Sequence, residues 1–207
     1  MLEYFTPDYI RGLLALYKDL KELFRPDRGV FEILEYDAAF TILDGHGKQA
    51  VLQKRLKVRF LQESVMAFQD YAWGDGSHFM DYRCSPGKMV DRWREGDRWN
   101  ILISLQETKS KGDVETFHIE HKIHDAFTQG SEWCQVESRH RTKRLKLSVT
   151  FPKDRHCTAA QILVRSQHKT IELGPDHFDL LPDGRQLVTW ETKNIKTFEV
   201  FTLKWNW

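Results

Sequence analysis

Short runs of alternating apolar and polar residues, separated by tight turn signals, constrain this chain more than any other feature. The clearest runs are Val65–Tyr71, Phe79–Cys84 and Trp99–Leu105, and the sequences Trp73-Gly74-Asp75-Gly76 and Ser85-Pro86-Gly87 lie between them. Successive side chains of a strand point to opposite faces of its sheet. The pattern therefore predicts half-buried antiparallel strands joined by short turns.

The same period continues along most of the chain after residue 30. Further predicted strands are Ala38–Leu43, Gln49–Leu61, Val114–Ile123, Trp133–Glu137, Leu145–Phe151, Ala160–Val164, Lys169–Leu173, Gln186–Trp190 and Phe198–Trp207. About a dozen strands are more than one simple sandwich uses. We therefore expect a mainly β protein with an antiparallel β-sandwich. Two packed units, residues 30–128 and 129–207 with the boundary near Gln129, are favoured over one large sandwich.

One segment has the period of a helix. Thr6-Pro7-Asp8 is a typical helix start, with a capping hydroxyl, a proline that needs no N–H partner, and an acid in the first turn. Apolar residues then recur at helical spacing up to Phe24, and Pro26 and Gly29 end the pattern. Residues 1–29 are thus predicted to form an N-terminal amphipathic helix.

The run Gln49–Leu61 contains one residue that does not fit its face. Leu52, Leu56 and Val58 share the apolar face, and Lys54 falls on that face as well. A lysine can pack its stem against apolar groups while its ammonium reaches water. We therefore expect Lys54 near a margin of its sheet.

Composition limits the partners and the compartment. The chain has 31 Lys and Arg against 30 Asp and Glu, a net charge of +1, so no overall field attracts nucleic acid or an anionic membrane. Cys84, Cys134 and Cys157 are far apart and form no C-x-x-C pair, which favours a reducing compartment. No signal peptide or apolar run of membrane-spanning length is visible. We expect a soluble, cytoplasmic protein.

Motifs for several kinds of catalysis are missing. The sequence contains no G-x-S-x-G, H-E-x-x-H or G-x-x-x-x-G-K-[ST] pattern. His118, His121 and His124 resemble metal ligands, but on a strand His121 points away from the other two. We therefore expect no metal site and no cofactor.

Several acids lie among aromatic residues, which is the combination that glycoside hydrolysis uses. These acids are Asp75, Asp81, Asp91, Glu95, Asp97 and Glu107. Asp75 lies between two glycines and Glu95-Gly96-Asp97 is typical of a turn, so turn chemistry explains these acids equally well. A carboxylate-dependent hydrolase acting on a saccharide-like substrate is the alternative function.

An exposed aromatic residue in a short loop is a plausible anchor for a partner. Trp99, Trp205 and Trp207 alternate in phase with apolar residues and are predicted to lie in the core, whereas Trp73 is expected to be exposed. The predicted contact surface for a protein partner or a small ligand consists of Tyr71, Trp73, Asp75 and Phe79.

The densest basic run is a candidate anion or nucleic-acid site. It contains Arg139, Arg141, Lys143 and Arg144. Its residues alternate along a strand, however, and exposed strand faces commonly carry Lys and Arg that discourage aggregation. A protein partner is therefore favoured over nucleic acid.

The C-terminal third carries a resemblance. Leu187-Val188-Thr189-Trp190, followed by Phe201, Leu203, Trp205 and Trp207 in alternation, resembles the closing strands of uncharacterised β-sandwich modules in bacterial signalling and conflict-system proteins. The resemblance implies a sensing, scaffolding or partner-binding role without chemistry of its own. We therefore expect a non-catalytic binding protein that engages a partner or ligand through a β-sandwich surface.

Overall fold

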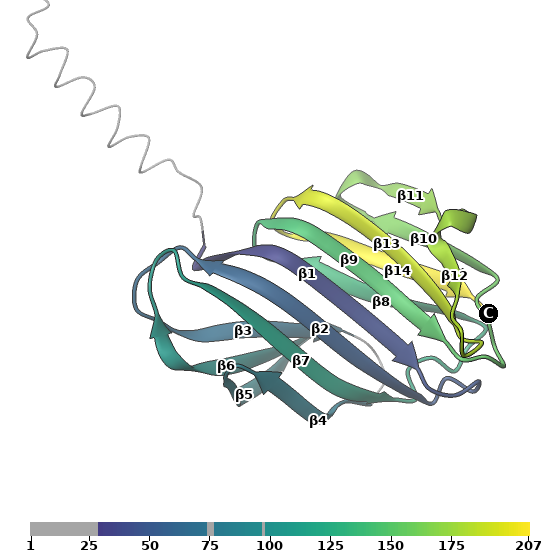
Figure 1. Ribbon diagram of the computed structural model, residues 1–207, viewed down its shortest axis with the longest axis horizontal. Coiled ribbons are helices and arrows are strands. Elements are labelled where there is room, and N and C mark those ends of the chain that lie inside the picture. Colours follow the sequence, from purple (N-terminus) through teal and green to yellow (C-terminus); the bar gives the residue numbers. More distant parts are fainter. Residues whose placement is uncertain (1–28, 74–76, 97) are drawn as a thin grey trace, which may run out of the picture.

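The alternating runs form strands in the computed structural model of the chain, which describes residues 29–73, 77–96 and 98–207 and is mainly β (Figure 1). The first seven strands are β1 (Phe31–Ile42), β2 (Gln49–Phe60), β3 (Val65–Trp73), β4 (Ser77–Ser85), β5 (Lys88–Glu95), β6 (Arg98–Lys109) and β7 (Val114–His124). They are followed by β8 (Ser131–Ser138), β9 (Thr142–Phe151), β10 (Ala159–Val164), β11 (Lys169–Glu172), β12 (Phe178–Leu180), β13 (Gln186–Ile195) and β14 (Glu199–Asn206).

The helices of these described ranges are short. They are the 3-10 turns η1 (Arg165–Gln167) and η2 (Pro175–His177). The amphipathic helix predicted between Thr6 and Phe24 lies outside the described residues. No helix in the described part of the chain has the length and apolar character that a membrane crossing needs.

The strands form one large sheet and two smaller ones. The large sheet has the order β12-β13-β9-β1-β2-β7-β4, the four-stranded sheet β11-β10-β14-β8, and the three-stranded sheet β3-β6-β5. In Figure 1, the three-stranded sheet lies at one end of the large sheet and the four-stranded sheet lies behind β9 and β13 at the other.

One pair of neighbours differs from the expected antiparallel arrangement. β1 and β9 run parallel, with Ile33 opposite Thr142 and Thr41 opposite Thr150. Parallel neighbours need a long crossover, and residues 43–141 supply it. The prediction of purely antiparallel pairing is therefore wrong at this place. The large sheet takes strands from both sides of residue 129, and the division into two units at that point stays a prediction.

Both smaller sheets pack on the same face of the large sheet. At one end, the ring of Phe68 (β3) stacks on Phe117 (β7) at 4.3 Å between centroids. At the other end, Trp205 (β14) contacts Phe151 (β9) at 5.6 Å. Trp205 is 2% exposed, so its prediction as a core residue is confirmed. Burial of such aromatic rings supplies much of the apolar contact between the layers.

An ion pair joins the large sheet to the three-stranded sheet inside this core. Lys54 (β2) is 4% exposed and Asp70 (β3) is 3% exposed. The Lys54 Nζ donates to Asp70 Oδ1 at 2.9 Å and to the backbone carbonyl of Tyr71, and the Tyr82 hydroxyl donates to Asp70 Oδ2 at 3.1 Å. The prediction that Lys54 lies at a sheet margin is wrong, because Asp70 reaches across from the opposite sheet and satisfies the ammonium in the interior.

Removal of one member of this pair is predicted to destabilise the protein strongly. Asp70→Ala leaves a buried ammonium without its counter-charge, and we expect the free energy of unfolding in urea to fall by about 3 to 5 kcal/mol. The double variant Lys54→Met/Asp70→Leu removes both charges and is expected to recover most of that loss.

The matched control is Lys122→Gln, which breaks the half-exposed pair between Lys122 and Asp81. It is expected to change the free energy of unfolding little. A loss for Asp70→Ala as small as that of the control would contradict the role given to the buried pair.

Candidate functional site

Two strand edges meet across a cleft in the smaller layer of the molecule. β3 ends the three-stranded sheet, β8 ends the four-stranded sheet, and the two strands contact each other without belonging to one sheet. A cavity of about 30 Å³ lies here, and its lining includes Asp70, Tyr71, Trp73, Glu137 and Arg139. Asp70 and Tyr71 point to opposite faces of β3. The cavity therefore passes the open edge of the strand and reaches the buried ion pair.

Aromatic rings and guanidinium groups converge on the outer side of this cavity. Trp73 pairs with Arg98 and Tyr71 pairs with Asn100, so these four side chains lie on one face of the three-stranded sheet. The Arg98 guanidinium lies 5.6 Å from the ring of Tyr71 and 5.8 Å from that of Trp73. The Arg139 guanidinium lies 5.0 Å from the ring of Tyr71. We name Tyr71, Trp73, Arg98, Asn100, Glu137 and Arg139 the edge cleft.

The charges of the edge cleft are partly balanced inside it. Arg139 Nε donates to Glu137 Oε2 at 3.1 Å, and an Arg98 terminal nitrogen lies 3.7 Å from the same carboxylate. Arg98 also pairs with Glu95. Burial raises the pKa of Glu137, and the positive charges of Arg98 and Arg165 oppose that rise. Burial raises the pKa of Tyr71 to about 12, so its hydroxyl keeps its proton at neutral pH.

Three donor groups of the edge cleft are buried without an acceptor in the described part of the chain. They are Trp73 Nε1, Arg98 Nε and Asn100 Nδ2. Arg98 is 8% exposed and Asn100 is 1% exposed. A buried donor without an acceptor costs about 1 to 3 kcal/mol. A ligand that supplies acceptors to these donors would therefore remove this cost when it binds.

The predicted contact surface is only partly within the described residues. Tyr71 and Trp73 lie together in the edge cleft. Trp73, expected to be exposed, is partly buried, with a buried indole nitrogen. Asp75 lies outside the described residues, as does the side chain of Phe79, whose backbone belongs to β4.

The basic run does not form a single patch. Arg139 belongs to the edge cleft. Arg141 and Lys143 are exposed, and Lys143 Nζ lies 3.8 Å from Glu32. Arg144 lies on the outer face of the large sheet. Only Arg139 of the four predicted anion-binding residues therefore joins the aromatic residues.

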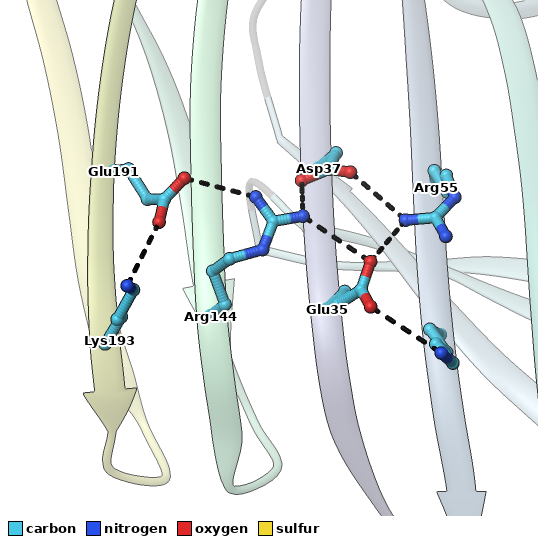
Figure 2. Close-up of polar contacts among 7 residues, drawn as sticks. Glu35, Asp37, Arg55, Arg144, Glu191 and Lys193 are labelled. Atoms are coloured by element: carbon cyan, nitrogen blue, oxygen red, sulfur yellow. Dashed lines mark hydrogen bonds and ion pairs between the residues drawn. The ribbon is translucent and has the colours of Figure 1, made fainter.

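The outer face of the large sheet carries a row of ion pairs across four strands (Figure 2). Arg144 lies 2.7 Å from Asp37 and 3.2 Å from Glu191, and Arg55 lies 2.6 Å from Glu35. The hydrogen bond from Arg55 is the main cause that lowers the pKa of Glu35. Acids and bases neutralise each other here, and half-exposed pairs contribute little stability. This face is therefore a solvated surface on which the charges balance.

The candidate acids and histidines show no convergence among the described residues. Asp81 and Asp91 are exposed, and the side chain of Glu95 is 65% exposed. His121 is fully buried whereas His118 is exposed, which confirms that they point to opposite faces. No group of three His, Cys, Asp or Glu side chains suited to a metal ion occurs within these residues.

Arg98, Asn100 and Glu137 were not predicted as site residues. Arg98 and Asn100 alternate with Trp99 and Ile101, and Glu137 alternates with Val136. Such alternation is typical of an exposed strand face. The sequence carries no signal that the outer faces of two different sheets meet here.

Comparisons with known proteins support the fold alone. No protein-family model matches the sequence, and no curated protein matches it. The chain is similar to a crystal structure of an M1 zinc metallopeptidase from Deinococcus radiodurans, with a TM-score of 0.50, 10% identity, and coverage of 84% of this chain and 42% of that one. A mutant of that peptidase bound to a Tyr-Ser-Ala substrate gives a TM-score of 0.51 with the same identity and coverage. The chain thus spans less than half the length of these structures.

His140, which lines the same cavity, makes stability depend on pH. Its ring packs on Phe31 at 3.9 Å, and burial lowers its pKa to about 4 from the ordinary 6.5. As the pH falls below 6.5, His140 becomes protonated in the unfolded chain, whereas in the folded chain it stays neutral until about pH 4. Stability is therefore highest above pH 6.5 and falls as the pH decreases toward 4.

We expect urea unfolding of the protein to lose about 2 to 3 kcal/mol more between pH 7 and pH 4.5 than unfolding of His140→Phe, which keeps the ring but cannot titrate. Both proteins contain the same carboxylates, so subtracting the two losses of unfolding free energy removes the contribution of those groups. Equal losses in the two proteins would show that His140 is not buried in its neutral form.

Proposed function

We propose that this chain is a non-catalytic binding protein, a sensor or scaffold, that engages a protein partner or a small ligand at the edge cleft. The observation that carries the proposal is the set of three buried donors without acceptors, beside two aromatic rings and two guanidinium groups. Aromatic and arginine side chains in a desolvated pocket are the usual anchors of recognition.

In this proposal the three sheets form a β-sandwich in which the large sheet is one layer and the two smaller sheets are the other. The edges of β3 and β8 then interrupt the second layer, and the binding site lies at the interruption. The three cysteines are free, which supports a cytoplasmic location.

The hydrolase alternative receives less support from the described residues. The cavity of the edge cleft, about 30 Å³, holds about two water-sized groups, which is too little for a sugar ring. A more open pocket of about 450 Å³ lies on the outer face of the large sheet, but its acids Asp37 and Glu120 are hydrogen-bonded to Arg144 and Gln53. Asp81, Asp91 and Glu95 are exposed rather than gathered at the cleft. A binding role uses the groups that the cleft does contain.

A thermal-shift screen of metabolites, with a parallel pull-down of protein partners, tests the proposal. A ligand at about 100 times its Kd stabilises the folded protein by about 2.7 kcal/mol, so it is detectable as a rise in Tm. We expect this rise, or the captured partner, to be lost in Trp73→Ala and in Arg139→Gln.

The matched control is Arg144→Gln, which removes a guanidinium from the ion pairs of the outer face. It is expected to keep the binding. Binding that survives both cleft variants and disappears in Arg144→Gln would move the site to the outer face. Turnover of a bound compound by the protein would contradict a non-catalytic role.

A further inference from the structure

The size of the cavity restricts the part of a ligand that can enter it. The volume of about 30 Å³ admits a group of a few atoms, not a ring system. The remainder of any larger ligand must therefore lie outside the cavity. The chemistry of the cavity walls decides which small group fits.

The walls combine apolar side chains with polar ones, and the polar ones include donors and positive charge. Trp73 and Arg139 both line the cavity. The Trp73 indole N–H has no acceptor among the described residues. Arg139 uses its Nε for Glu137, and no acceptor of the described ranges bonds its two terminal nitrogens. A planar guanidinium with free terminal nitrogens matches a carboxylate in two parallel hydrogen bonds.

The nearby charges favour a negative group despite Glu137. Arg98, Arg139 and Arg165 act on the cleft, against the carboxylates of Glu137 and Glu95. The side chain of Glu95 is 65% exposed, so water screens its charge. Among the described residues that line the cavity, the acids are Asp70 and Glu137. Lys54 balances the charge of Asp70 at 2.9 Å, so Glu137, beside Arg139, is the acid that opposes an incoming anion. Its removal should therefore strengthen binding of an anion.

We propose that the edge cleft binds a carboxylate group of its ligand, with Trp73 Nε1 and the terminal nitrogens of Arg139 as donors and Arg98 as supporting charge. This inference rests on the proposed function, because it names the chemistry of the same site. The carboxylate belongs either to a small organic acid or to the C-terminus of a peptide.

Isothermal titration of the full chain with four probes tests the inference. The probes are benzoate, benzamide, and an N-acetylated tripeptide with a free or an amidated C-terminus. We expect each acid to bind and its amide to bind about tenfold more weakly or not at all, because a hydrogen bond to a charged group is lost. Tighter binding of the peptide acid assigns a peptide C-terminus, and tighter binding of benzoate assigns a small acid.

Two variants with opposite expected effects separate this role from a structural one. Arg139→Gln is expected to weaken acid binding by about tenfold or more. Glu137→Gln is expected to strengthen it, because the repelling charge is removed while the shape stays. A purely structural role would not improve binding in either variant. Arg144→Gln on the outer face is the control and should bind the acids like the unchanged protein.

The outcomes distinguish the inference from the proposed function. Acid and amide probes that bind equally and lose affinity in Trp73→Ala would overturn the carboxylate while leaving the edge cleft as the site. Acid binding that is unchanged in both Arg139→Gln and Glu137→Gln would overturn the inference as well. Absence of any probe binding, with no effect of the cleft variants on a captured partner, would overturn both.

Discussion

The buried contact between Lys54 and Asp70 sets the relation between the two layers of strands at the edge cleft. Lys54 Nζ holds Asp70 and the carbonyl of Tyr71, so the open edge of β3 is fixed to the inner face of the large sheet. An ion pair of this kind is costly unless every charged and polar group finds a partner. Tyr82 completes that set by donating to the same carboxylate. The position of Tyr71, and with it the outer side of the cleft, follows from this interaction.

The two sides of the layered structure use charge differently. On the outer face of the large sheet, Arg144, Asp37 and Glu191 satisfy one another in contact with water. In the edge cleft, burial leaves donors of Trp73 and Arg98 without acceptors in the described residues. Groups that already pair with each other in contact with water gain little free energy when a ligand binds. A buried donor without an acceptor gains a new hydrogen bond. This contrast directs the functional proposal to the cleft rather than to the more strongly charged face.

Sequence periodicity predicted nearly all of the strands, because one buried face imposes a period of two on each of them. It did not predict the parallel pair of β1 and β9, since strand order depends on contacts between distant segments. The predicted position of Lys54 at a sheet margin was wrong for a related reason. Lys54 and Asp70 each interrupt the apolar face of a strand. They indicate a buried ion pair only when it is known that the two strands face each other. The approach of Arg139 to Tyr71 likewise joins segments that the sequence separates.

The indole N–H of Trp73 reports most directly on whether the edge cleft accepts a carboxylate. In a 15N-labelled sample its resonance is identified by its loss in Trp73→Phe, and it is then followed during titration with benzoate and with the peptide acid. We expect a saturable downfield shift of this resonance, because the N–H gains a charged acceptor, with the other indole resonances nearly unchanged. A Trp73 resonance that stays in place while the acids bind would contradict carboxylate binding at the edge cleft.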